Sequence, residues 1–416
     1  MRKIISSIDI GSGFIKLLVG EFIGNRLNIL GASKVDSHGL VNNEITDREA
    51  LIKSIKHVVD NVSNALGADI KKTILGINTI NSKLVKTTYT INIEREDNTI
   101  TGEDISTLIS KCAEGKIEEG YVLLGAVPVE FLLDNNEVVK DPKGIKSSTL
   151  SVKAIVVTSP KDYVKNILEV VEESGLKVVD VIPNCIGDYY SFRTNTSDSR
   201  IGAVINLGYE TTSISIFNKR ILTNTKVIKI GSKNIEKDIS FIHKIDEKNS
   251  RAIYKDIVLA SPSLANPNEY RIVTNEDGKN VKIDQYELSE IAASRIEEIL
   301  NLAKKQINIL TKKEISYIIV TGGLTEIRDF RLTLESVFGK NVYLGTLNII
   351  GARDNSYSSA IGILKYFDEK ITLRGKTFSI FTSSELNNMN NGEMQASSNA
   401  NNNSLLSKVF GYFFDS

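Results

Sequence analysis

Short runs of β-branched residues alternate with segments of helical periodicity along most of the chain. Lys3–Ile10 and Phe14–Glu21 have the composition of strands and are joined by a short turn with two glycines. In Arg48–Leu66 the apolar residues recur at three- and four-residue spacing, which predicts an amphipathic helix. Strands that alternate with helices indicate an α/β fold. The same patterns predict strands at Ile74–Ile77, Val178–Ile182, Ala203–Asn206, Ser213–Phe217 and Ile315–Val320, and helices at Asp162–Glu173, Glu287–Leu310 and Leu324–Leu334.

Two segments interrupt this alternation and resemble insertions. Residues 83–160 combine strands expected at Thr87–Ile93 and Val152–Thr158 with a helix expected at Glu103–Glu114, which indicates a small α+β subdomain. Residues 224–312 are richer in helix. We therefore expect a first domain (1–82 and 161–199) with its insertion (83–160), a second domain (200–223 and 313–382) with its insertion (224–312), a linker (383–403) and a terminal helix (404–416).

The composition excludes several classes of protein. Of the 416 residues, 51 are Lys or Arg and 51 are Asp or Glu, so the formal charge is zero and gives no reason to expect nucleic acid as a partner. Two distant cysteines, Cys112 and Cys185, argue against a disulfide framework or a thiolate zinc site. The three histidines have no metal-ligand spacing and accompany no nucleophile motif. No window approaches the roughly 18 apolar residues of a membrane-spanning helix, and no signal peptide precedes the first strand, so we expect a cytoplasmic protein.

The C-terminal tail differs in composition from the rest of the chain. Eight of the 17 residues in 387–403 are Asn, and such a segment buries too little apolar surface to offset its ordering entropy, so we expect a disordered linker. The apolar residues after it follow helical spacing, which predicts an amphipathic helix that binds a membrane surface. The alternative is a helix that packs back on the protein's own core. The expected membrane-binding residues are Leu405, Leu406, Lys408, Val409, Phe410, Phe413 and Phe414.

An internal repeat carries most of the candidate chemistry. Ile8–Leu17 aligns with Ile205–Ile214 at an offset of 197 residues, and each segment consists of a buried strand, an acid or amide, a glycine turn and a second strand. Two such hairpins that face each other can clamp a phosphate chain, because turn glycines let backbone N–H groups point at the anion. Lys16 adds a positive charge, and Asp9 is suited to hold hydrated Mg²⁺. Taken alone, such a turn is a weak signal and is more typical of an ordinary β-hairpin.

A glycine pair near the C-terminal end adds a third motif. Gly322 and Gly323 follow the buried strand at Ile315–Val320 and precede the helix expected at Leu324–Leu334. Glycines at this position let a flat base lie against the backbone near a helix N-terminus. The alternative is a plain strand-to-helix turn.

In this order, the three motifs resemble the ATPase superfamily of actin, Hsp70 and sugar kinases, and their details resemble the FtsA family of bacterial cell-division proteins. The resemblance extends over nearly the whole chain. The insertion at 83–160 stands where that family carries its distinctive subdomain (1C-type), and the tail resembles the family's membrane anchor. The segments that carry the resemblance are Ile8–Gly13, Ile230–Ile239, Arg295–Ile299, Ile319–Gly323 and Tyr357–Leu364.

The resemblance implies an actin-like two-domain fold that binds ATP or ADP with Mg²⁺ in the interdomain cleft and forms filaments. It also implies that the protein ties the FtsZ ring to the inner face of the cytoplasmic membrane at the division site and contacts other divisome proteins. The FtsZ C-terminal peptide is expected on 224–312, where Arg295, Lys304 and Lys305 offer positive charge to an acidic-apolar peptide. Carried over by position, the metal site has Asp9, through water, and Asn206, and the nucleotide site has Asp9, Gly11, Ser12, Gly13, Lys16, Gly208, Thr211, Thr212, Lys255, Gly322 and Gly323.

Four positions depart from the superfamily pattern and argue against hydrolysis more than against binding. Asn206 replaces the second carboxylate on the Mg²⁺ side, and Glu210 adds negative charge near the phosphates. Ala252 stands where the family often has a ribose-contacting Glu, and Ile182 where hydrolysing relatives carry a Glu or Gln that orients water. We therefore expect weak or absent ATP hydrolysis and assign no catalytic residue. The alternatives are an active ATPase or small-molecule kinase of the same fold, and a pilus-assembly or chaperone relative.

Overall fold

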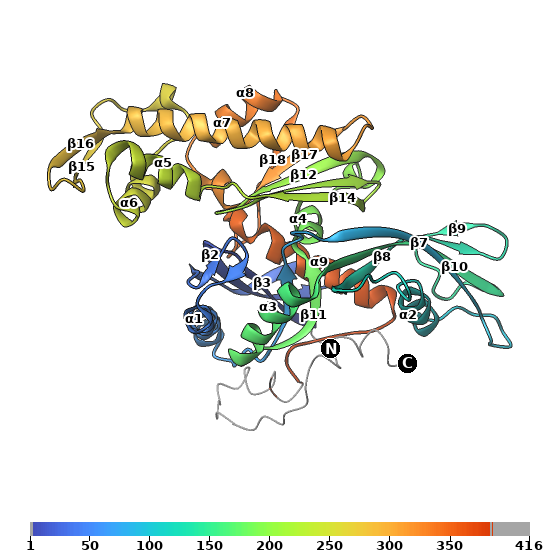
Figure 1. Cartoon of the computed structure of the whole chain (residues 1–416). Coiled ribbons are helices and arrows are strands. Elements are labelled where there is room, and N and C mark those ends of the chain that lie inside the picture. The colour runs from blue at the N-terminus through green and yellow to red at the C-terminus, as the bar shows by residue number, and fades with distance from the viewer. Residues whose placement is uncertain (1–2, 383–384, 386–416) are drawn as a thin grey trace.

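The computed structural model describes residues 3–382 and residue 385, and it has two main lobes with a smaller subdomain beside the first (Figure 1). Each lobe contains a five-stranded sheet, and the subdomain contains a four-stranded sheet. The expected terminal helix at 404–416 and, apart from residue 385, the expected linker at 383–403 lie outside the described residues. Among the helices of the described part, none is both long and apolar enough to cross a membrane.

The sheet of the first lobe has the strand order β11-β6-β1-β2-β3. Strands β1, β2 and β3 form an antiparallel meander. Strand β6 pairs parallel to β1, and β11 pairs parallel to β6. The predicted helix α1 (Arg48–Leu66) is confirmed with its bounds, since Asp47 caps its first turn and Gly67 ends it in the left-handed region. The strands are β1 (Lys3–Ile10), β2 (Phe14–Ile23), β3 (Arg26–Asp36), β6 (Lys72–Ile77) and β11 (Lys177–Pro183).

The sheet of the second lobe repeats this topology, with the order β14-β13-β12-β17-β18. Three consecutive strands again form an antiparallel meander, and the next two pair parallel. The long helix α7 (Gln285–Leu310) packs on this sheet, as Figure 1 shows, and buries one apolar stripe against it. The strands are β12 (Ile201–Leu207), β13 (Thr212–Asn218), β14 (Ile221–Ile228), β17 (Tyr317–Thr321) and β18 (Val342–Leu344). The internal repeat is therefore a repeat of structure as well as of sequence.

Two helices connect the lobes and cross at a pair of glycines. A Cβ on Gly362 of α9 (Ser358–Leu373) would overlap the carbonyl oxygen of Gly187 in α4 (Asn184–Phe192), so only glycine permits this approach. Helix α9 packs on β1, β2 and β6. The chain beyond it stays on the same lobe, where the N–H of Ile380 donates to the carbonyl oxygen of Ile4 over 2.8 Å. Residues 358–382 thus belong with the first lobe rather than with the second domain, where we expected them.

The first insertion forms the expected α+β subdomain. Its sheet has the order β7-β10-β8-β9, and α2 (Gly102–Lys111) covers one face with a capping box at its N-terminus. Its apolar core is separate from those of the two lobes. The strands are β7 (Lys83–Asn92), β8 (Tyr121–Leu133), β9 (Val138–Val139) and β10 (Thr149–Pro160), the last of which leads directly into α3 (Lys161–Glu173) of the first lobe.

The second insertion departs from its expected bounds. Strand β14 continues to Ile228, past the expected boundary at 223, and the predicted helix at Leu324–Leu334 is two helices, η3 (Gly323–Glu326) and α8 (Phe330–Phe338). Between these two helices Ile327 is extended, Arg328 forms a β-bridge with Leu259, and Asp329 is left-handed. The chain is therefore not helical over these residues. The remaining elements are α5 (Lys233–His243), α6 (Glu247–Ile257), β15 (Tyr270–Thr274), β16 (Asn280–Asp284), β4 (Leu40–Val41), β5 (Glu44–Ile45), η1 (Ser197–Ser199), η2 (Pro262–Leu264) and η4 (Asn355–Tyr357).

Candidate functional site

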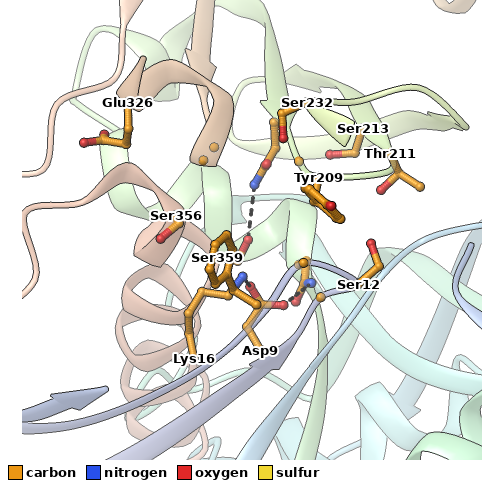
Figure 2. Close-up of a pocket in the computed structure, with 18 of the residues that line it drawn as sticks. Asp9, Ser12, Lys16, Tyr209, Thr211, Ser213, Ser232, Glu326, Ser356 and Ser359 are labelled. Carbon is orange, nitrogen blue, oxygen red and sulfur yellow. Dashed lines mark hydrogen bonds and ion pairs between the residues drawn. The ribbon is translucent and has the colours of Figure 1, made fainter. Parts of the chain in front are cut away.

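A cavity of about 470 Å³ lies between the two lobes. Figure 2 shows the first-lobe strand end with Asp9 and Lys16 on one side, and the second-lobe hairpin with Tyr209, Thr211 and Ser213 on the other. All but one of the expected nucleotide and metal residues line this cavity. They are Asp9, Gly11, Ser12, Gly13, Lys16, Asn206, Gly208, Thr211, Lys255, Gly322 and Gly323.

The two glycine turns have the same local geometry. The N–H of Gly11 donates to the carbonyl oxygen of Phe14 over 3.1 Å, and that of Gly208 donates to Thr211 over 2.9 Å. A Cβ at either glycine would lie 3.0 Å or less from that carbonyl oxygen, so both turns need glycine. Because the two bonds join equivalent positions of the repeat, two matching backbone turns face one cavity.

Thr212 is the expected residue that does not line the cavity. Its side chain is fully buried, and its hydroxyl donates to the carbonyl oxygen of Ile230 over 2.8 Å. Glu210 does not line the cavity either, but it lies beside the first glycine turn: it accepts bonds from Lys233 Nζ over 2.8 Å and from the N–H of Asn42 over 2.6 Å, and it also interacts with the Ser12 side chain. Burial alone would raise the pKa of Glu210, but these bonds outweigh it and hold that pKa below its usual value. Ile182 is buried in the apolar core between the sheets and does not reach the cavity.

Asp9 is held at the cavity wall by two partners. Lys16 Nζ lies 2.6 Å from Oδ2, and Asn184 Nδ2 donates to Oδ1 over 2.9 Å. Asn184, at the start of α4, was not identified from the sequence. Its Oδ1 is buried without a partner in the described structure, as are Oδ1 of Asn78 and Nδ2 of Asn43, and all three residues line the cavity. Unpaired polar atoms of this kind fit a polar, hydrated ligand such as a nucleotide with Mg²⁺.

Asn206 makes a second polar cluster on the cavity floor. Its Nδ2 donates to Asp188 Oδ1 over 2.8 Å and lies 3.4 Å from the hydroxyl of Ser359. The hydroxyls of Ser358 and Ser359 donate to the same Asp188 oxygen over 2.9 and 2.7 Å. Burial, together with the nearby charge of Asp9, raises the pKa of Asp188 to about 6 despite these donors. The only sequence signal for Asp188 is an acid within the otherwise apolar segment Cys185–Tyr190.

Aromatic and charged side chains close the cavity mouth. A Cβ on Gly13 would lie 2.6 Å from the Tyr209 ring, so the ring packs directly on the opposite glycine turn. The Tyr209 hydroxyl donates to Glu236 over 2.8 Å. Arg251 of α6 reaches across the mouth to Asp36 over 2.7 Å, and its guanidinium carbon lies 5.3 Å from the Tyr209 ring and 5.6 Å from the Phe14 ring.

No cluster of three or more His, Cys, Asp or Glu side chains that could hold a metal ion occurs in the described structure. One or two carboxylates, such as Asp9, suit a Mg²⁺ ion that arrives with a phosphate ligand and keeps several waters.

The residues expected to bind a peptide are mostly engaged within the chain. Arg295 binds Asp238 over 2.6 and 2.8 Å and also pairs with Glu298. Lys304 donates to the carbonyl oxygen of Val337, while Lys305 is exposed. Arg295 nevertheless lines a groove between α5, α7 and α8 whose other charged residues are acidic and whose apolar rim is exposed. The acidic residues are Asp238, Glu290, Glu297 and Glu298, and the exposed apolar ones are Phe241, Ile242 and Leu332.

Two family models match this chain, and together they cover more than half of it. The model for "Cell division protein FtsA" matches residues 203–362, and the model for the "SHS2 domain inserted in FTSA" matches residues 81–158, close to the inserted subdomain. The chain belongs to the FtsA family of cell-division proteins. The FtsA of Bacillus subtilis (strain 168) is 27% identical over 376 residues, which cover 89% of this chain and 84% of the relative. The FtsA of Escherichia coli (strain K12) is 25% identical over 384 residues, which cover 88% of this chain and 91% of the relative.

Solved structures confirm the actin-like fold. A PilM–PilN type IV pilus biogenesis complex matches with a TM-score of 0.57 at 13% identity, covering 86% of this chain and 96% of that chain. MreB5 of Spiroplasma citri bound to ADP matches with a TM-score of 0.52 at 14% identity, covering 89% and 97%. At these identities the likeness concerns the fold alone. The FtsA models and relatives, by contrast, favour an actin-like cell-division protein over a kinase, chaperone or pilus-assembly protein.

Proposed function

We propose that this FtsA-family chain binds ATP or ADP between its lobes, assembles into filaments on the inner face of the cell membrane, and attaches the FtsZ ring there with other division proteins. The observation that carries the nucleotide part is the pair of matching glycine turns at 11–14 and 208–211, which face one cavity. Structures of the same fold with ADP and with AMPPNP, both of Spiroplasma citri MreB5, add support.

Different residues of the cavity would bind different parts of a nucleotide. The two turns present backbone N–H groups to phosphate oxygens, and Lys16 adds a full positive charge. Gly322, with φ of 102°, and Gly323 leave room for the adenosine beside Lys255. A Mg²⁺ ion that arrives with the nucleotide would neutralise phosphate charge, and Asp9 would bind its water shell.

Substitution of Asp9 tests the nucleotide site. We expect Asp9→Ala to weaken binding of Mg–ADP in calorimetry, because the carboxylate that faces the metal's waters is lost. Lys161→Ala, at the exposed start of α3, is the control and should bind like wild type. Equal affinity in all three proteins would contradict the role of Asp9.

Hydrolysis is proposed to be weak or absent. Ile182 is buried away from the cavity, and the second hairpin ends its first strand with the amide of Asn206 instead of a carboxylate. An Ile can neither donate nor accept the hydrogen bond with which a Glu or Gln orients the attacking water, and Asn206 offers no carboxylate on the Mg²⁺ side. A turnover of about 1 s⁻¹ or more, at the low end for ordinary enzymes, would contradict this.

The groove between α5, α7 and α8 is the proposed site for the FtsZ C-terminal peptide. Because Arg295 is already bound by Asp238 and Glu298, we assign the main contact to the exposed apolar rim instead. Phe241 has 85% of its surface exposed, an unusual state for a large aromatic side chain on a helix. Phe241→Ser should weaken binding of a fluorescent FtsZ C-terminal peptide, whereas Ile350→Ser, at a residue 80% exposed elsewhere, should not. Equal affinities would place the peptide on another surface.

The tail at 404–416 is proposed to attach the protein to the membrane through its apolar residues. Partial burial of six such side chains is worth on the order of 5–10 kcal/mol, part of which is lost when the helix folds on contact. Attachment by one tail is then reversible, and a filament with many tails binds stably. Phe410→Glu should abolish co-sedimentation with liposomes, and added salt should change wild-type binding little. Binding that collapses at moderate salt would show that charge holds the tail instead.

A further inference from the structure

The second hairpin lacks the carboxylate that the first hairpin has at the equivalent position, but a carboxylate lies beside it. Asp9 is the last residue but one of β1, and Asn206 holds the same position in β12. Asp188 of α4 lies 2.8 Å from the amide of Asn206 and lines the same cavity. The amide of Asn206 on β12 and the carboxylate of Asp188 on α4 therefore lie together where the first hairpin has the single carboxylate of Asp9.

The charge of Asp188 is not balanced by a cation within the described structure. Asp9 is paired with Lys16, but the recorded hydrogen-bond donors to Asp188 are the neutral side chains of Asn206, Ser358 and Ser359. All three donate to Oδ1. The N-terminus of α9 adds only the partial positive charge of a helix end, about half a unit. A carboxylate that is 1% exposed and lacks a cationic partner is costly, and a bound cation removes that cost.

We propose that Asp188 supplies the second carboxylate of the metal–nucleotide site, so that the Mg²⁺ of a bound nucleotide meets Asp9 from the first lobe and Asp188 from α4. This inference rests on the proposed nucleotide binding. Asn206 acts as a positioning residue, because its amide fixes Asp188 Oδ1 and leaves the other carboxylate oxygen for the metal's water shell. Since α4 crosses α9 and contacts strands of both sheets, the metal would contact a helix that packs on both lobes.

The purely structural alternative is that Asp188 only ties α4 to the start of α9. The two readings differ in what Mg²⁺ does. A structural tie affects ADP binding equally with and without the metal, whereas a metal contact affects only the gain in affinity that Mg²⁺ provides.

The experiment is calorimetry of ADP binding in Mg²⁺ and in EDTA, with thermal melting of each protein as a check on folding. Asp188→Asn should lower the Mg²⁺-dependent gain by roughly 10-fold or more, the scale for loss of an outer ligand. The exchange of both groups, Asp188→Asn with Asn206→Asp, keeps a hydrogen bond between an amide and a carboxylate and should restore most of the gain. Asp60→Asn, on the exposed face of α1, is the control and should match wild type.

Each outcome bears on a different statement. A wild type that binds no nucleotide at all overturns the proposed function and this inference together. Wild-type binding with an unchanged Mg²⁺ gain in Asp188→Asn, or an equal loss in Mg²⁺ and in EDTA, overturns the inference alone. If Asp188→Asn does not fold, the exchanged protein decides, because a folded exchange variant without a Mg²⁺ gain also contradicts the role of the carboxylate.

Discussion

The ion pair across the cavity mouth should control how fast a nucleotide leaves. Arg251 of the second lobe binds Asp36 of the first over 2.7 Å, and its guanidinium carbon lies 5.6 Å from the Phe14 ring of the first lobe. The Arg251→Ala change removes both contacts. The Arg251 and Asp36 side chains are 26% and 46% exposed, so solvent screens the pair and about 0.2–1 kcal/mol is the appropriate range.

The magnitude follows from the two contacts. A cation–π contact at an exposed site adds about 0.5–1 kcal/mol, so the closed state loses on the order of 1–2 kcal/mol in total. That loss is worth a factor of roughly 5–30 in the ratio of open to closed molecules. If release requires opening, the dissociation rate of ADP rises by the same factor.

The assay is stopped-flow displacement of a fluorescent ADP analogue by excess unlabelled ADP. Asp36→Ala removes the ion pair but not the contact with the Phe14 ring, so it should accelerate release less than Arg251→Ala does, and the double variant should add little to Arg251→Ala alone. Arg331→Ala removes an ion pair with Glu335 on α8 and serves as the control. Equal release rates for Arg251→Ala and Arg331→Ala would refute the reasoning.

Three further predictions distinguish effects on stability from effects on nucleotide binding. Gly362→Ala should lower the melting temperature, at a cost of about 1–3 kcal/mol or more, because the new methyl group meets a carbonyl of the crossing helix, while Gly125→Ala meets no neighbour and should not. Burial raises the pKa of Glu236, so the folded protein loses stability as the pH rises above the ordinary carboxyl range. Glu236→Gln should therefore have a higher melting temperature than wild type at pH 7. The difference in melting temperature should shrink at about pH 4. A pH-independent difference would contradict this. Thr211→Val should weaken ADP binding without changing the melting temperature, because Thr211 lines the cavity. Thr212→Val should cost about 1 kcal/mol of stability and leave ADP binding intact, because it removes a buried hydrogen bond. Calorimetry of ADP binding and melting curves of both variants check these two outcomes.

The parts of the site that are local in sequence could be predicted. A strand, a glycine turn and a second strand lie within ten residues, so the repeat at Ile8–Leu17 and Ile205–Ile214 was visible without the structure. Even the distinction between Thr211 and Thr212 had a signal. Side chains alternate in a hairpin strand, and Tyr209, Thr211 and Ser213 face the cavity while Glu210 and Thr212 do not. The error of placing Thr212 at the phosphates came from leaving out this alternation.

The parts that come from other elements could not be predicted. Asn184 and Asp188 reach the cavity because α4 crosses between the sheets, and the rotation of a helix about its axis depends on what it packs against. Arg251 reaches Asp36 only because α6 and the end of β3 meet at the cavity mouth, over 200 residues apart in sequence. The assignment of 358–382 to the second domain failed for a related reason, since chain order alone does not say that the chain returns to the first sheet.

The distribution of apolar and polar contacts between the lobes limits how the molecule can move. Ile5 and Leu18 of the first sheet and Val204 and Phe217 of the second belong to one continuous buried cluster that also contains apolar residues of α4 and α9. Separating the lobes would expose this cluster, at roughly 1.5–3 kcal/mol for each large side chain, whereas opening the mouth breaks only a few polar contacts. An opening of the mouth that keeps this cluster buried therefore requires a rotation of the lobes near α4 and α9, whose apolar residues lie in it. A nucleotide that binds to both glycine turns with even a few kcal/mol of binding free energy is then sufficient to set the angle between the lobes. The polar contacts at the cavity mouth, which oppose or favour opening, are of that size.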